Sequence, residues 1–148
     1  KPKNVEIGKY YGYPPMNLIE CKASERSGKF FLTLFEKIDL DLTHMRELFP
    51  EEESYIAGLR PDDLLLGGEG NNGMVSFFGT VMLSEVIGSE TIMFLRHNNS
   101  EFRMLVPKIV GHEGVQVQVF FDPDNLYIYG GKSQELITKC VKNRENNG

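Results

Sequence analysis

Three histidines and two cysteines are the residues in this 148-residue chain best suited to metal binding or nucleophilic chemistry. They are His44, His97, His112, Cys21 and Cys140. A zinc site usually combines closely spaced ligands such as a Cys-x-x-Cys pair, and the sequence contains no such pair. A Ser-His-Asp or Cys-His arrangement is defined by geometry, and no spacing here indicates one. We therefore expect no metal-binding, cofactor-binding or catalytic residues in this chain.

The two cysteines leave two interpretations open. They are free thiols, or they form one long-range disulfide. We favour free thiols, because a domain of this size does not need a disulfide to be stable.

Acidic pairs could serve as acid–base groups or as a cation site. Asp62 and Asp63 follow Pro61, and Asp122 and Asp124 flank Pro123. Aspartate beside proline is typical of turns and caps, so we assign these residues to turn and cap chemistry. We interpret the acidic run at residues 51–53 as a solvated loop.

A glycine-rich segment, GGEGNNG at residues 67–73, raises the question of a phosphate cradle. A P-loop requires Gly-x-x-x-x-Gly-Lys-Ser/Thr followed by a helix. No lysine follows here, and the next residues, MVSFFGTVML, are strand-like. The segment is therefore expected to be a hairpin loop.

Composition narrows the function classes. The net charge is -5, which argues against a general nucleic-acid binder, since such proteins carry a basic face. The hydrophobic content of 41% is enough for a core. Aromatic residues interleaved with Lys and Arg could stack on single-stranded nucleic acid, but they occupy core-like positions in the pattern.

Short strands are expected along most of the chain. Residues 16–22 and 29–35 form a hairpin around the polar turn 23–29, with Ile19 and Cys21 on one side of the first strand. Residues 56–66 form a strand, a corner fixed by Arg60-Pro61, and a second strand, because proline removes a backbone donor and keeps the preceding residue extended. Residues 40–53 are the best helix candidate, with Thr43 as N-cap and Pro50 as stop.

The clearest strands follow in the second half of the chain. We expect them at residues 74–87, 90–97, 101–107 and 115–121, separated by hairpin turn signals, with a further strand at 126–129 after a tight turn. Val115, Val117 and Val119 face one way and the intervening glutamines the other. Gly79 suggests a bulge. The tail at 133–140 forms a short strand or a helix.

This pattern predicts an all-β fold with one short helix, built as small OB-like or MOP-like β-barrels in tandem, since closing a sheet removes its exposed edges.

Three segments carry a family resemblance: GLRPDDLLL (58–66), GTVMLSEVIGSETIMFLR (79–96) and VPKIVGHEGVQVQVFFDPDNLYIY (106–129). They resemble the C-terminal regulatory region, of TOBE/OB-fold type, of the ATP-binding subunits of sugar-importer ABC transporters of the maltose, trehalose and glycerol-3-phosphate type. The hallmarks there are a Gly-Ile-Arg-Pro-Glu corner, a Leu-Gly-x-Glu-Thr strand and a Phe-Asp-Pro turn. The matching positions here are Gly58, Arg60, Pro61, Asp62, Gly88, Glu90, Thr91, Phe121, Asp122 and Pro123.

The opening of the chain is similar to the same family. NVEIGKYYGYPPMNLIE resembles the handover from the last ATPase helix through Gly-x-Pro-x-Met-Asn, here residues 12–17. Two departures stand out: Asp62 replaces the usual Glu, and residues 67–73 are longer and richer in glycine. No Walker A, signature or Walker B motif is present.

The resemblance implies a domain organisation and a role. Residues 1–14 would be the end of the ATPase domain and a linker, and 15–148 the regulatory domain, with lobes at about 15–58 and 59–131 and a C-terminal tail. Such a domain holds two copies of the ATP-binding subunit together and receives regulatory signals from a protein or small ligand. ATP and magnesium would bind only in the ATPase domain upstream, which would also contact the permease, in the cytoplasm at the inner face of the membrane.

Two other function classes remain open. One is a ligand sensor for a sugar or an oxyanion, for which Arg60, Arg96 and Arg103 would be natural anion contacts. The other is a single-stranded nucleic-acid-binding OB module, which the acidic balance disfavours.

Overall fold

The computed structural model describes residues 16–51, 54–67, 73–107 and 112–139. The expectations for residues 1–14 and for the glycine-rich loop at 68–72 lie outside these ranges, as does Cys140. Within the described residues no helix is long and apolar enough to cross a bilayer.

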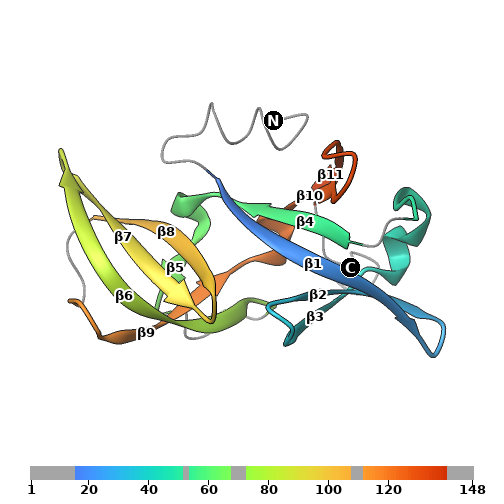
Figure 1. Ribbon diagram of the computed structural model, residues 1–148, viewed down its shortest axis with the longest axis horizontal. Helices are drawn as coiled ribbons and strands as arrows, with labels where there is room; N and C mark the ends of the chain where they lie inside the picture. Colours follow the sequence, from blue (N-terminus) through green and yellow to red (C-terminus); the bar gives the residue numbers. More distant parts are fainter. Residues whose placement is uncertain (1–15, 52–53, 68–72, 108–111, 140–148) are drawn as a thin grey trace.

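Two antiparallel sheets make up the fold, and they lie side by side along the longest axis of the molecule (Figure 1). The six-stranded sheet has the order β11-β10-β4-β1-β2-β3. Its strands are β1 (Asn17–Arg26), β2 (Lys29–Leu34), β3 (Ile38–Asp41), β4 (Ser54–Leu59), β10 (Tyr127–Gly130) and β11 (Leu136–Lys139).

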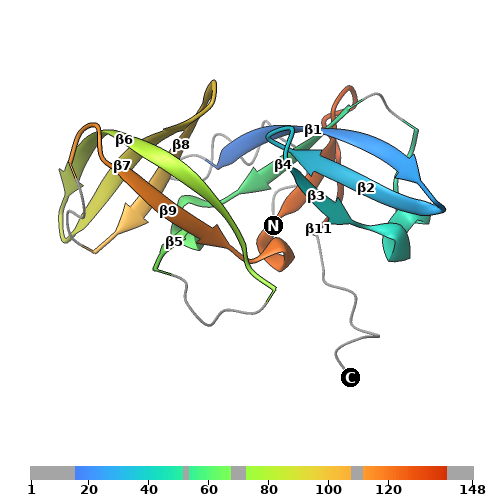
Figure 2. The same cartoon turned by 90° about the horizontal axis from the view of Figure 1, so that it is seen from below.

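The five-stranded sheet has the order β5-β9-β6-β7-β8. Its strands are β5 (Leu65–Leu66), β6 (Val75–Ile87), β7 (Glu90–His97), β8 (Ser100–Val106) and β9 (Gln116–Phe121). Short 3-10 helices connect the strands, namely η1 (Thr43–Leu48), η2 (Pro61–Asp63) and η3 (Pro123–Asn125). Both sheets are strongly curled (Figure 2), and the all-β expectation is confirmed.

The first hairpin forms, but the polar turn expected at residues 23–29 is wrong, because β1 continues to Arg26 and only Ser27 and Gly28 make the turn. β1 pairs with β2 around Ser27 and Gly28, which both have positive φ. Ile19 and Cys21 are buried while Glu20 is exposed, so the alternation read from the sequence holds. The Cys21 thiol donates to the Ile19 carbonyl at 3.4 Å.

The helix expected over residues 40–53 is wrong. The chain there continues as β3 and then makes only the 3-10 helix η1, whose N-cap position is Leu42 rather than Thr43. The reason lies in how Thr43 is used. Its hydroxyl donates to Asp41 Oδ1 at 2.5 Å and accepts from the Phe30 backbone N–H at 2.9 Å. These bonds tie the segment to β2 and leave no side chain to cap an α-helix.

The corner at Arg60-Pro61 is confirmed. Arg60 is extended at φ -70° and ψ 143°, and Pro61 begins η2 at the position where its missing N–H costs nothing. Leu64 then leads into β5. The chain therefore leaves the six-stranded sheet at Leu59 and enters the five-stranded sheet at Leu65.

The strands of the second sheet match the expected segments closely. Val119 is buried and the two glutamines of β9 are exposed, as the alternation predicted. The bulge expected at Gly79 is misplaced, because Gly79 pairs regularly with Val117 and the register instead shifts between Val81 and Leu83. The absence of a side chain at Gly79 lets the Leu95 side chain pack closely against β6, since a Cβ at Gly79 would lie 3.3 Å from Leu95 Cβ.

After η3 the chain returns to the first sheet. Asp122 accepts from the Asp124 N–H at 2.9 Å, which confirms the tight turn. β10 then pairs with β4, and the tail adds β11 as a strand. The proposed lobes at 15–58 and 59–131 stay a prediction about domains, and the sheets divide the chain differently, since residues 127–139 complete the first sheet.

The main core lies between and within the two curled sheets. Buried side chains of both sheets belong to one hydrophobic cluster, including Leu32 and Leu34 from the first and Phe77, Phe102 and Phe121 from the second. A smaller cluster of Met16, Tyr127 and Tyr129 packs separately on the first sheet.

Candidate functional site

The family-motif positions at the corner meet residues from both ends of the described chain. Gly58 pairs with Tyr127 of β10. A Cβ on Gly58 would meet the Met16 Sδ atom and lie 3.3 Å from the Tyr129 ring, so a larger residue there would require the Met16 side chain to move. Met16, Gly58 and the aromatic residues of β10 therefore form one packed junction.

Arg60 and the acids after it lie on the same junction. The Arg60 guanidinium carbon is 5.8 Å from the centroid of the Tyr127 ring, a cation–π contact. Pro61 is buried and Asp62 is exposed. Burial raises the pKa of Asp63, and the neighbouring Asp62 carboxylate adds to that effect.

Asn17, the last residue of the Gly-x-Pro-x-Met-Asn pattern, joins the two sheets. Its side-chain amide donates to the Arg103 carbonyl at 2.9 Å, and its Oδ1 accepts from the Arg103 N–H at 2.7 Å. Asn17 is 2% exposed. One side chain thus satisfies both backbone groups of a residue in β8, as a neighbouring strand would.

The other motif positions are placed in two regions. Phe121 is buried in the main core, and Asp122 and Pro123 form the turn into β10. Gly88, Glu90 and Thr91 lie apart from these, at the tip of the β6–β7 hairpin, where Gly88 has φ +62° and Thr91 is buried. The structure therefore brings the first and third motifs together at the sheet junction and leaves the second at a hairpin end.

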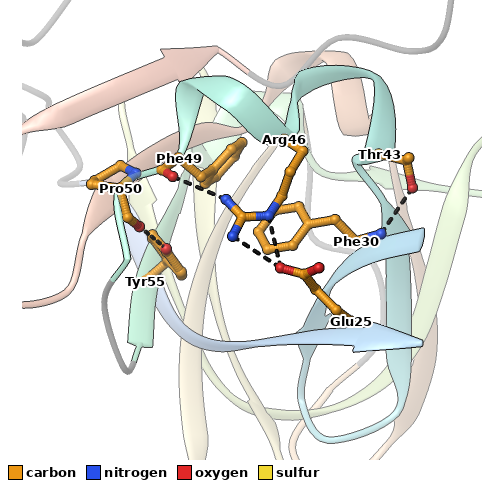
Figure 3. Close-up of polar contacts among 7 residues, drawn as sticks. All are labelled: Glu25, Phe30, Thr43, Arg46, Phe49, Pro50 and Tyr55. Carbon is orange, nitrogen blue, oxygen red and sulfur yellow. Dashed lines mark hydrogen bonds and ion pairs between the residues drawn. The ribbon is translucent and has the colours of Figure 1, made fainter. Parts of the chain in front are cut away.

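A first cavity, of about 850 Å³, lies over η1 and the end of β1. Figure 3 shows the network that shapes it. The Arg46 guanidinium bonds Glu25 Oε1 through Nε and one terminal nitrogen, both at 2.9 Å, and donates to the Phe49 carbonyl at 3.1 Å through the other. The same guanidinium lies 4.7 Å from the Phe30 ring centroid, and Tyr55 donates to the Pro50 carbonyl. Arg46 is therefore committed to holding η1 in place.

A second cavity, of about 380 Å³, lies where the β2–β3 turn faces the five-stranded sheet. Among the described residues that line it, the charged side chains are Lys37 and Arg96, and none is acidic. The lining residues are Lys37, Ile38, Ser76, Phe77, Phe78, Thr80, Arg96, His97, Asn98 and Gln116.

Polar groups line this cavity in an ordered row. Thr80 of β6 pairs in register with Gln116 of β9 on one side and with Arg96 of β7 on the other. Arg96 also forms an exposed ion pair with Glu101 at 3.1 Å. His97 donates from Nδ1 to the Phe78 carbonyl, since the two atoms are 2.7 Å apart and a carbonyl can only accept.

Exposed apolar side chains occur along β6, on both faces of the strand. They share a large exposed fraction, from 36% for Met82 to 62% for Val86, and they are Phe78, Met82, Leu83, Val86 and Ile87. We call this set the β6 strip. Figure 1 places the second half of β6 and its partner β7 at one end of the molecule, opposite the β1–β2 hairpin.

The residues first considered for chemistry are scattered. His44 and His112 are exposed and far from His97 in the chain, and no group of three His, Cys, Asp or Glu side chains suited to a metal lies within the described ranges. Arg60, Arg96 and Arg103 do not converge on one point. They contact Tyr127, Glu101 and Phe94 respectively.

Comparison with known proteins supports the fold. No family model and no curated protein matches the sequence. Among solved structures, the chain is similar to the cytoplasmic molybdate-binding protein ModG in a form with molybdate bound, at a TM-score of 0.56 and 15% identity. The match covers 76% of this chain and 94% of that one. The described part of the chain is thus an all-β protein with small barrels of the OB/MOP type.

Proposed function

We propose that this chain is the regulatory and dimerisation domain of the ATP-binding subunit of an ABC-type sugar importer. The domain itself would have no enzymatic activity. The parent subunit would bind ATP and magnesium in its ATPase domain, contact the permease through that domain, and work in the cytoplasm at the inner face of the membrane. The support for this is the three-motif resemblance together with the packing of Met16, Gly58 and Tyr127 at one junction.

The observation that carries the dimerisation role is the β6 strip. Soluble monomers seldom expose several large apolar side chains together, and such patches commonly mark interaction surfaces. Leu83 and Ile87, 46% and 39% exposed, lie four residues apart and so on the same face of β6, on a hairpin that stands at one end of the molecule. We assign this surface to a second copy of the chain.

A contact of this kind suits an importer ATPase. Two ATPase domains must separate and close during each cycle while the dimer stays assembled. A second interface away from the nucleotide keeps the partner at a high effective concentration throughout. In a two-fold dimer both copies use the same surface, so one substitution in the strip changes the interface at two symmetry-related places.

Sedimentation across a concentration series tests the dimerisation role. The unmodified chain should show a concentration-dependent dimer. Leu83→Glu should raise the dissociation constant of this dimer about tenfold or more, because a carboxylate would be buried at the interface. Leu48→Glu is the matched control, since Leu48 is 51% exposed on η1, outside the strip.

Two results would argue against the proposal. One is a monomer at every concentration. The other is an equal effect of Leu83→Glu and Leu48→Glu, which would show that the strip is not the contact surface.

A second candidate function is the sensing of a small anionic ligand. Two observations favour it: the OB/MOP-type fold shared with a molybdate-binding protein, and the second cavity, whose charged lining residues are all cationic. Sensing and dimerisation are compatible within one regulatory domain.

A further inference from the structure

We infer that the second cavity binds a small molecule through a tetrahedral oxyanion group, with Lys37 and Arg96 as its cationic contacts and the Thr80 row as hydrogen-bond donors. The inference rests on the second candidate function and gives that function a site. The oxyanion could be a free inorganic ion or the phosphate of a phosphorylated sugar.

The charge of the cavity is opposite to that of the chain. The chain has a net charge of -5, yet Lys37 and Arg96 line the cavity with no acidic residue among the described residues of the lining. Within the described ranges Lys37 forms no ion pair. Arg96 is paired with Glu101, but the Glu101 side chain is 72% exposed, and ion pairs exposed to solvent are weak. An entering oxyanion could therefore share the Arg96 guanidinium.

Neutral donors complete the site. The Thr80 hydroxyl and the Gln116 amide lie on adjacent strands in the same row as Arg96. The Ser76 hydroxyl accepts from Gln118 Nε2 at 3.2 Å and so has its own hydrogen free to donate into the cavity that it lines. Asn98 adds a second amide. Oxyanion sites in proteins combine cations with neutral donors in this way.

The backbone that presents Lys37 is held in an unusual conformation. Phe35 and Glu36 both have positive φ, 57° and 61°, which is rare for a bulky residue and is seen where surrounding structure imposes it. Phe35 is anchored against the rings of Phe77 and Phe102, at centroid distances of 5.1 and 5.3 Å. This anchor sets Lys37 against the five-stranded sheet.

His97 lines the cavity, and its ring packs edge-on against Phe35 and Phe77 at centroid distances of 4.8 and 5.3 Å. With Nδ1 donating to the Phe78 carbonyl, the neutral ring has a lone pair on Nε2. Nε2 is buried and has no hydrogen-bond partner in the described structure. The cavity, at about 380 Å³, also has room for more than a bare ion, which favours the phosphorylated sugar over inorganic phosphate.

NMR titration of the whole chain tests the site. The probes are inorganic phosphate, molybdate, glucose 6-phosphate and, as an uncharged comparison, glucose. We expect glucose 6-phosphate to bind more tightly than inorganic phosphate, and glucose not to bind. Amide shifts should concentrate at residues 37–38, 76–80 and 96–98.

Variants then identify the contacts. Lys37→Ala should weaken oxyanion binding at least tenfold, while Lys29→Ala, an exposed lysine at the other end of β2, should leave it unchanged. Thr80→Val keeps the side-chain shape and should weaken binding a few-fold, which separates loss of a donor from loss of folding.

The outcomes separate the site from the function. Binding that shifts residues elsewhere, or that is unaffected by Lys37→Ala, would overturn this site and leave the sensing function standing. No binding of any oxyanion at about 10 mM, an affinity too weak for specific recognition, would overturn both. Equal binding of inorganic phosphate and glucose 6-phosphate at the cavity would support the oxyanion site and overturn the preference for the sugar phosphate.

Discussion

Tyr129 is a buried phenol with an unusual acidity. Its side chain is fully buried, and its hydroxyl has no hydrogen-bond partner within the described residues. Burial raises the pKa of Tyr129 to about 12, the nearby Tyr127 adds to this effect, and Arg60 partly opposes it. The folded protein therefore keeps this phenol neutral at pH values where the unfolded chain has lost the proton.

The pH dependence of stability follows from this difference. Between the usual tyrosine pKa of 10.0 and the folded value of about 12, the folded state binds more protons than the unfolded state, so the free energy of unfolding falls as pH rises. In urea titrations at a series of pH values, the unmodified chain should lose more stability over this range than Tyr129→Phe. Tyr127→Phe is the control. Parallel curves for the unmodified chain and Tyr129→Phe would show that the Tyr129 pKa is not raised.

Gly58 shows why some motif residues could be recognised in the sequence and not explained there. Its place in the Gly-x-Arg-Pro pattern can be read from the sequence, but the side chains that a Cβ there would crowd, from Met16 and Tyr129, come from distant segments. Asn17, at the end of the Gly-x-Pro-x-Met-Asn pattern, is a second example. Nothing in its local sequence indicates that it will bond the backbone of Arg103, because that contact spans two sheets.

At the scale of elements, the segment from Asp41 to Phe49 is held by side chains rather than by helical propensity. Hydrogen bonds from the Thr43 hydroxyl, and then from its N–H, hold the pKa of Asp41 below its usual value. Arg46 fixes the end of η1 through Glu25, the Phe49 carbonyl and the Phe30 ring (Figure 3). The apolar spacing in this segment suggested a helix, and these polar ties explain why the strand and a short 3-10 helix form instead.

Arg46→Lys tests how much the guanidinium contacts of Arg46 with Glu25 and the Phe49 carbonyl contribute to stability. Lysine keeps the charge but cannot bond Glu25 and the Phe49 carbonyl together, so the free energy of unfolding should fall by about 1 kcal/mol, with faster amide exchange in η1. Arg26→Lys is the matched control, because Arg26 also pairs with a carboxylate and an aromatic ring but its side chain is 54% exposed. Equal losses in both variants would mean that Arg46 contributes no more than an ordinary surface pair.

Most strands could be predicted from the sequence, because their signals are local. Pro61 encodes a corner, Gly28 and Gly88 encode turns with positive φ, and β9 alternates along its length. The second cavity could not be predicted. Its residues come from separate segments, and the β2–β3 turn that presents Lys37 has no glycine or asparagine at its positive-φ positions, which are Phe35 and Glu36. The register that aligns Gln116, Thr80 and Arg96 is also a property of the assembled sheet.

At the scale of the whole molecule, the two sheets are joined by a shared core and by the two Asn17 hydrogen bonds. Asn17→Ala would leave the Arg103 N–H and carbonyl without partners in a buried setting, so the free energy of unfolding should fall by about 1–3 kcal/mol. Asn17→Asp keeps an acceptor for the N–H but loses the donor, and Asn99→Ala, in the β7–β8 turn, is the neutral control. Urea denaturation measures all three. An Asn17→Ala variant as stable as the Asn99→Ala control would show that the bridge does not hold the sheets together.

The return of the chain to its first sheet has a consequence for how the protein is made. β1 and β4 emerge from the ribosome early, but their sheet is completed by β10 and β11, whose last residue is Lys139. Every strand of the other sheet, from β5 to β9, is synthesised in between. The edge of β4 that later pairs with β10 therefore has no partner strand during that interval. An unpaired strand edge is prone to pairing with other chains. A nascent chain stalled before residue 127 would expose this edge of β4 to strands of other chains. The faster β5 to β9 fold, the sooner β10 can pair with β4 and cover the edge.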